Sequence, residues 1–123
     1  MKYTLILLLL LITASCGKSI EDIDAKELKT ACDCAHAAEI ILTERMDLQE
    51  SIIGKDVDDI QNSDYTDNWS LMVKKQEEVL KVCNGKLEFN LCPEWKTIKK
   101  KLMDRGKSIN QKVQEQAMKN SQN

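Results

Sequence analysis

Apolar residues recur every three or four positions along most of the chain after residue 23, a spacing that predicts helices buried through one face. The first predicted helix covers 24–53. Asp24 and Glu27 have the spacing of a capping box at its start, and Gly54 is suited to end it. Its apolar stripe consists of Leu28, Ala31, Ala35, Ala38, Leu42 and Ile52. The small side chains at the centre of this stripe predict the close approach of a neighbouring helix.

Two further helices are predicted at 65–83 and 93–117, with a polar connector at 55–64 and a short connector of alternating polar and apolar residues at 86–91. Asn84-Gly85 is suited to end the earlier helix, and Pro93 fits the first turn of the later one. Their apolar positions are Tyr65, Trp69, Met72, Val79, Leu80 and Cys83, then Trp95, Ile98, Leu102, Ile109 and Val113. Residues 120–123 are expected to fray. We therefore predict an all-α domain over 24–119, folded as a small three-helix up-down-up bundle.

The first fifteen residues have the layout of a secretory signal rather than of a folded segment. Lys2 carries a positive charge, residues 5–12 form an unbroken apolar run, and residues 13–15 are small. A helix of eight residues is about 12 Å long, whereas the hydrocarbon core of a bilayer is about 30 Å thick. The run is therefore too short to span a membrane, and we predict a cleaved signal peptide over 1–15.

The sequence Leu-Ile-Thr-Ala-Ser-Cys at 11–16 resembles the lipobox of bacterial lipoproteins, with Thr13 standing where that family usually has Leu. The resemblance implies that Cys16 becomes the lipidated N-terminus and carries acyl chains such as palmitate. Residues 16–23 are then a lipidated end and a short tether. Gly17 stands where Asp signals retention in the inner membrane of some such proteins, so the outer membrane is favoured, on its periplasmic or its surface face.

Four further cysteines, Cys32, Cys34, Cys83 and Cys92, remain in a chain that is expected to enter an oxidising compartment. Cys32 and Cys34 lie about 80° to either side of the apolar stripe, so a bond between them would break the helix. In an up-down-up bundle, Cys83 and Cys92 lie level with the start of the first helix. We therefore predict two disulfides, each joining one of Cys32 and Cys34 to one of Cys83 and Cys92, with the pairing left open.

Alternative chemistry is conceivable around Cys32, Cys34 and His36. Cys32 and His36 are four residues apart and share a helix face, so they are candidate metal ligands if Cys83 or Cys92 completes the set. A thiol-redox role for the two cysteines is the other alternative. The acidic connector at 55–64 fails as a calcium loop, because Ile60 and Gln61 stand where a ligand and a glycine are required. We predict no resident metal and no cofactor.

Charge is divided along the chain, although the total is nearly balanced at 20 acidic and 18 basic residues. Residues 16–68 hold 14 acidic and 5 basic side chains, whereas residues 69–123 hold 6 acidic and 12 basic ones. The third predicted helix carries most of the bases: Lys96, Lys99, Lys100, Lys101, Arg105, Lys107 and Lys112. They lie on the side away from the apolar stripe, as expected of a solvated face that could also touch anionic head groups near the bilayer.

The residues favour a binding protein over an enzyme. With one histidine, no Ser/His/Asp or Cys/His catalytic set is apparent, and no glycine-rich phosphate loop is present. We therefore predict a lipid-anchored, non-enzymatic helical module that binds a protein partner in the envelope, of an inhibitor, immunity or accessory type. A structural envelope lipoprotein without a discrete ligand is the alternative. Neither nucleic acid nor a small-molecule substrate is expected.

Overall fold

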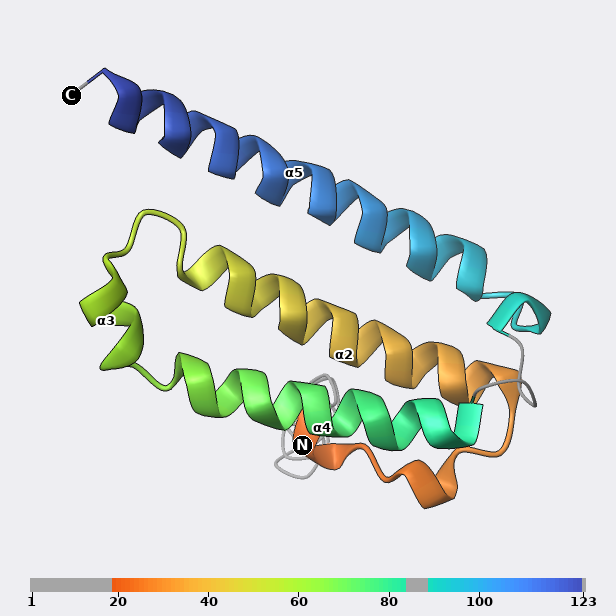
Figure 1. Ribbon diagram of the computed structural model, residues 1–123. Coiled ribbons are helices and arrows are strands. Elements are labelled where there is room, and N and C mark those ends of the chain that lie inside the picture. The colour runs from red at the N-terminus through yellow and green to blue at the C-terminus, as the bar shows by residue number, and fades with distance from the viewer. Residues whose placement is uncertain (1–18, 84–88, 123) are drawn as a thin grey trace, which may run out of the picture.

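The structure is a computed structural model that describes residues 19–83 and 89–122 (Figure 1). These residues contain four α-helices and no strand, which confirms the predicted all-α class. The helices are α2 (Ala31–Ser51), α3 (Val57–Gln61), α4 (Tyr65–Cys83) and α5 (Trp95–Ser121), and three short 3-10 turns precede them or lie between them: η1 (Ile20–Asp22), η2 (Ala25–Glu27) and η3 (Phe89–Leu91). The lipobox and Cys16 lie outside the described residues.

The first long helix begins later than the sequence predicted, because a stronger capping signal lies downstream. Thr30 is the N-cap of α2: its hydroxyl accepts from the Asp33 amide at 3.1 Å, and the Asp33 carboxylate accepts from the Thr30 amide at 3.0 Å. This reciprocal pair satisfies two amides that a helix start leaves unbonded. The predicted capping box at Asp24 and Glu27 is wrong; Asp24 caps only the short turn η2, by accepting from the Lys26 amide.

The other helix boundaries lie close to the predicted ones. Helix α4 covers the predicted residues 65–83, and the acidic connector before it contains the single short helix α3. Helix α5 starts at Trp95, after Pro93, and continues to Ser121, four residues beyond the predicted end at 117. Gly54 follows α2 with a φ of +75°, a left-handed conformation that glycine adopts without strain.

Helix α2 lies between α4 and α5 and contacts both, as Figure 1 shows. The turn η1 also packs on α2, and η2 packs on α4. Within 19–83 and 89–122, no interface of comparable size joins α4 to α5. The molecule is therefore organised around one central helix, whereas a closed bundle would have each helix packed on the other two.

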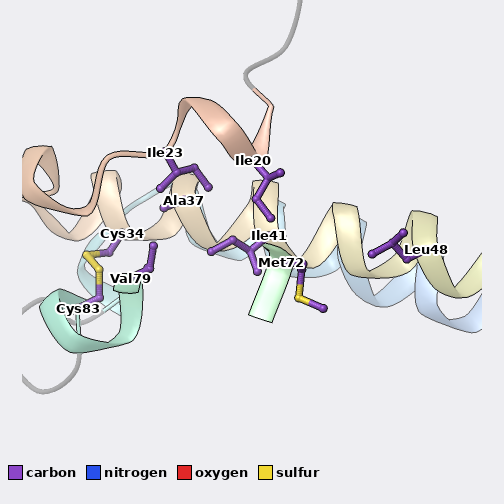
Figure 2. Close-up of a cluster of buried hydrophobic side chains, with 9 residues drawn as sticks. All are labelled: Ile20, Ile23, Cys34, Ala37, Ile41, Leu48, Met72, Val79 and Cys83. Atoms are coloured by element: carbon purple, nitrogen blue, oxygen red, sulfur yellow. A yellow bond between two sulfur atoms is a disulfide. The ribbon is translucent and has the colours of Figure 1, made fainter. Parts of the chain in front are cut away.

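The larger core lies between α2, α4 and the segment before α2, and we call it the α4-side core. Its buried members are Ile20, Ile23, Cys34, Ala37, Ile41, Leu48, Met72, Val79 and Cys83. Figure 2 shows Ile20 and Ile23 directed toward the α2 side chains Ala37 and Ile41. The Lys75 ammonium adds a 2.8 Å hydrogen bond to the Ile23 carbonyl oxygen. Residues 19–23, expected to belong to a tether, are thus part of the packed domain.

A smaller core joins α2 to α5, and we call it the α5-side core. Its buried members are Ala35, Cys92, Ile98 and Leu102, with half-buried neighbours Leu42, Met46 and Trp95 around them. Ala31, Ala35 and Leu42 of the predicted stripe lie on the face of α2 toward α5, whereas Leu28, which precedes α2, packs against the α4-side core. The face of α2 toward α4 was missed. Two predicted core residues are exposed instead: Leu80 at 47% and Val113 at 48%. Val113 lies beyond Ile109, the last buried residue of α5.

Candidate functional site

The four described cysteines form two disulfides at one end of the molecule. Cys32 is bonded to Cys92 and Cys34 to Cys83, with Cα atoms 4.8 Å and 5.9 Å apart, respectively. This is one of the two pairings that the sequence left open. It follows from the two faces of α2, because Cys34 belongs to the face toward α4 and Cys32 to the face toward α5. Both neighbours of the central helix are thus covalently held at the same end.

His36 lies beside this end and bonds to the residue that caps α5. Its Nε2 atom is 2.6 Å from Oε2 of Glu94, and both side chains are more than half exposed. Cys32 borders the same surface hollow as this pair, but its sulfur is bonded to Cys92, so it could ligate a metal only after reduction of that disulfide. A thiol-redox role would proceed by exchange at the two disulfides, which do not join Cys32 to Cys34. The part of the chain that the structure describes contains no cluster of three or more ligating side chains that could hold a metal ion.

An acidic hollow of about 350 Å³ opens next to His36, and its polar groups already serve the fold. Asp33 accepts hydrogen bonds from the Lys29 and Thr30 amides at 3.0 Å each. These bonds, reinforced by one from the Thr30 hydroxyl, lower the pKa of the Asp33 carboxyl, and His36 contributes a smaller Coulombic effect. Glu94 is bonded to His36. The carboxylates of the hollow therefore stabilise a helix start and a helix junction.

Ion pairs run along the interface between α2 and α5. Beyond His36 and Glu94, Lys101 pairs with Glu39 at 3.3 Å and Lys112 with Glu50 at 3.0 Å. Arg105 lies between them and pairs with both Asp47 and Glu50. Hydrogen bonding from Lys112, its charge and that of Arg105 together lower the pKa of Glu50. Because the partners advance together along both helices, the ion pairs fix the register of α5 on α2.

The remaining lysines of α5 form a separate surface, which we call the basic face. It consists of Lys96, Lys99, Lys100 and Lys107 around the side chain of Met103, which is 53% exposed. At 100° per residue these positions share one side of the helix, away from Ile98 and Leu102. Within residues 19–83 and 89–122, none of the four lysines has an ion pair. They bound a shallow hollow of about 480 Å³ together with Asp104.

The sequence grouped all seven bases of this helix as one solvated face, and the structure divides them. Lys101, Arg105 and Lys112 point to α2, whereas the basic face points outward. The spacing of the bases could have indicated this division. On a helical projection, residues 101, 105 and 112 lie nearer the buried stripe of α5 than residues 96, 100 and 107 do. The sequence also missed the pairing of His36 with Glu94, which depends on how α5 docks.

Comparison of the chain with protein-family models, curated proteins and solved structures gave no significant match. Among the described residues, no helix combines the length and the apolar character that a membrane crossing requires. The basic face is thus the candidate functional surface on the strength of its own geometry and charge.

Proposed function

We propose that this chain is a small bacterial lipoprotein, anchored through acyl chains on Cys16, whose non-enzymatic helical domain binds a protein partner in the cell envelope. The observation that carries the proposal is the basic face of α5. Four lysines that form no ion pair within residues 19–83 and 89–122 surround an exposed methionine, and a polar rim around an apolar centre is typical of protein interfaces. The three long helices act as one up-down-up module that presents this face.

The position of the anchor supports a partner other than the bilayer for this face. Ser19 begins the described chain beside the α4-side core, because Ile20 packs there, and α5 lies on the other side of α2 (Figure 1). Ser19 is three positions after Cys16, a stretch of chain that reaches at most about 11 Å. Lipidation of Cys16 would therefore hold the α4 side near the membrane and leave the basic face directed away from it.

The anchor is tested by replacing the lipidated residue in the full chain. We expect Cys16→Ser to move the protein from the membrane fraction to the soluble fraction, because several acyl chains are needed for stable anchoring. The two disulfides do not involve Cys16, so its loss leaves the fold intact. Retention of the variant in membranes would refute the lipoprotein assignment.

The binding surface is tested by photocrosslinking in the native bacterium. A benzoylphenylalanine in place of Met103 is expected to give a discrete crosslinked product. The same probe at Leu80, which is similarly exposed but lies on α4, serves as the matched control and should give none. Equal crosslinking at both positions, or none at Met103, would count against a specific partner at the basic face.

A further inference from the structure

The acidic half of the chain contains a run of exposed aspartates in neighbouring elements, which we call the acidic end. It includes α3 and the start of α4, and its members are Asp56, Asp58, Asp59, Asp64 and Asp67. All five are exposed, and the ion pairs of residues 19–83 and 89–122 include none of them. Val57 stands among these carboxylates and is 68% exposed. The acidic end thus resembles the basic face in combining like charges with one exposed apolar side chain, but its charge has the opposite sign.

One molecule cannot bring its two charged surfaces together. Helix α3 lies at the end of the molecule away from the start of α5, as Figure 1 shows, and the two disulfides fix the start of α5 at the far end. The lysines of the basic face extend from residue 96 to residue 107, about 17 Å along the helix. The basic face and the acidic end therefore cannot contact each other within one molecule, but they can do so between two copies.

We propose that the partner of the basic face is a second copy of this chain, bound through its acidic end. The inference rests on the proposed function and names the partner of the same surface. Lys96, Lys99, Lys100 and Lys107 of one copy then face the aspartates around Val57 of the next. Charge complementarity selects this orientation, because two basic faces or two acidic ends would repel each other.

A contact between two different surfaces uses the basic face of one copy and the acidic end of the other. The pair keeps one free acidic end and one free basic face, so the contact can propagate into open rows or closed rings. Exposed ion pairs are individually weak and are screened by salt. The association is therefore expected to be weak in solution and stronger on a membrane, where anchoring raises the effective concentration of copies.

The test uses the processed lipoprotein in neutral phosphatidylcholine vesicles and a carbodiimide, which joins amines to carboxylates that touch. Mixing unlabelled protein with nitrogen-15-labelled protein identifies crosslinks between copies by mass spectrometry. We expect crosslinks between the lysines of the basic face and the aspartates of the acidic end. Raising NaCl from about 50 mM to about 500 mM should lower the dimer yield about fivefold or more.

Charge reversal separates self-association from binding of another acidic protein. One variant reverses three lysines of the basic face: Lys96→Glu, Lys99→Glu and Lys100→Glu. Another reverses three aspartates of the acidic end: Asp56→Lys, Asp58→Lys and Asp59→Lys. Each variant alone should lose the dimer, whereas an equal mixture should regain it, since every contact in the mixture again joins opposite charges.

A matched control changes the net charge by the same amount as the basic-face variant but replaces lysines outside α5. Its substitutions are Lys26→Glu, Lys74→Glu and Lys81→Glu. This variant should retain the dimer yield, and circular dichroism verifies that all variants are helical. Failure of the mixture to recover, or an equal loss in the control, would overturn self-association. If Met103 then crosslinks to a different protein, the proposed function stands and only the identity of the partner changes. If Met103 crosslinks to nothing, the proposed function fails as well.

Discussion

The two sides of α2 are held to their neighbours in different ways. On the α4 side, nine buried residues make a continuous core, and the segment before α2 extends it. On the α5 side, four buried residues lie near the disulfides, and ion pairs continue the contact toward Glu50 and Lys112. Each side has one disulfide, and both disulfides lie at the same end.

This difference shows how a small domain divides stability and specificity between its interfaces. Apolar burial stabilises in proportion to the area removed from water, so the α4 side supplies most of the packing energy. Exposed ion pairs contribute little to the free energy of unfolding. They favour one register of α5 along α2, because a shift of α5 along its axis would separate the paired side chains. Helix α5 is therefore aligned by ion pairs, held at its start by the Cys32–Cys92 disulfide and packed on a smaller core, and it carries the basic face on its free side.

Removal of either disulfide should cause the largest loss of unfolding free energy. The two removals should also differ in which neighbour of α2 they release. The bonds close loops of 60 and 49 residues in sequence separation. Loss of either is expected to cost about 4 kcal/mol of unfolding free energy on the chain-entropy account. Cys32→Ala with Cys92→Ala should also release α5, seen as a selective loss of amide-exchange protection. Cys34→Ala with Cys83→Ala should reduce the amide-exchange protection of α4 less than the first variant reduces that of α5, because the α4-side core remains. Equal loss of protection in the two helices would contradict the comparison.

Truncation of one core side chain on each side compares the packing directly. Met72 is 1% exposed in the α4-side core, whereas Leu102 is 7% exposed in the α5-side core. We expect Met72→Ala to lower the unfolding free energy by about 3 kcal/mol and Leu102→Ala by about 2 kcal/mol. Urea denaturation measures both values. A larger loss at Leu102 would show that the α5 side carries more packing than its burial indicates.

Neutralisation of one ion pair tests the specificity of the α5 side. A double-mutant cycle with Glu39→Gln and Lys101→Gln should give a coupling of about 0.5 kcal/mol at low salt, and near zero in about 1 M NaCl. Lys99→Gln provides the control, since Lys99 has no ion pair among the described residues and its loss should be neutral. A coupling that persists in high salt would refute the assignment of this pair to a screened surface contact.

Lowering the pH should reduce the stability that Asp33 gives to the start of α2, and this effect should be smaller than that of any substitution above. The pKa of Asp33 and that of Glu50 are both lowered in the folded protein. The unfolded chain therefore binds the protons first as the pH falls, and stability declines below about pH 4 through the folded-state pKa values. Asp33→Asn should lower the melting temperature at pH 7 and flatten its decline in acid. An unchanged acid profile would show that the Asp33 carboxylate contributes nothing to the pH dependence.

Local capping and burial explain where sequence reasoning succeeded and where it failed. Helix α4 could be predicted to the residue, because its apolar stripe and the Asn84-Gly85 stop agree. The start of α2 was placed too early, because the spacing of Asp24 and Glu27 imitates the capping box that Thr30 and Asp33 form. Both signals are local, but Thr30 and Asp33 complete the reciprocal capping bonds that Asp24 and Glu27 do not, and Ile20 and Ile23 pack the segment before Thr30 against α2.

The sequence by itself determined the all-α class, the limits of α4, the approximate start of α5 and the rule that Cys32 and Cys34 cannot bond to each other. These follow from helical periodicity and from local geometry, which depend on neighbouring residues alone. Only the tertiary structure decided which cysteine pairs with which, and that α2 buries two faces. It also divided the bases of α5 between α2 and the outer surface. The physical reason is that these features depend on the side of α2 to which each neighbour docks, and contacts between residues about 50 to 60 positions apart determine that choice.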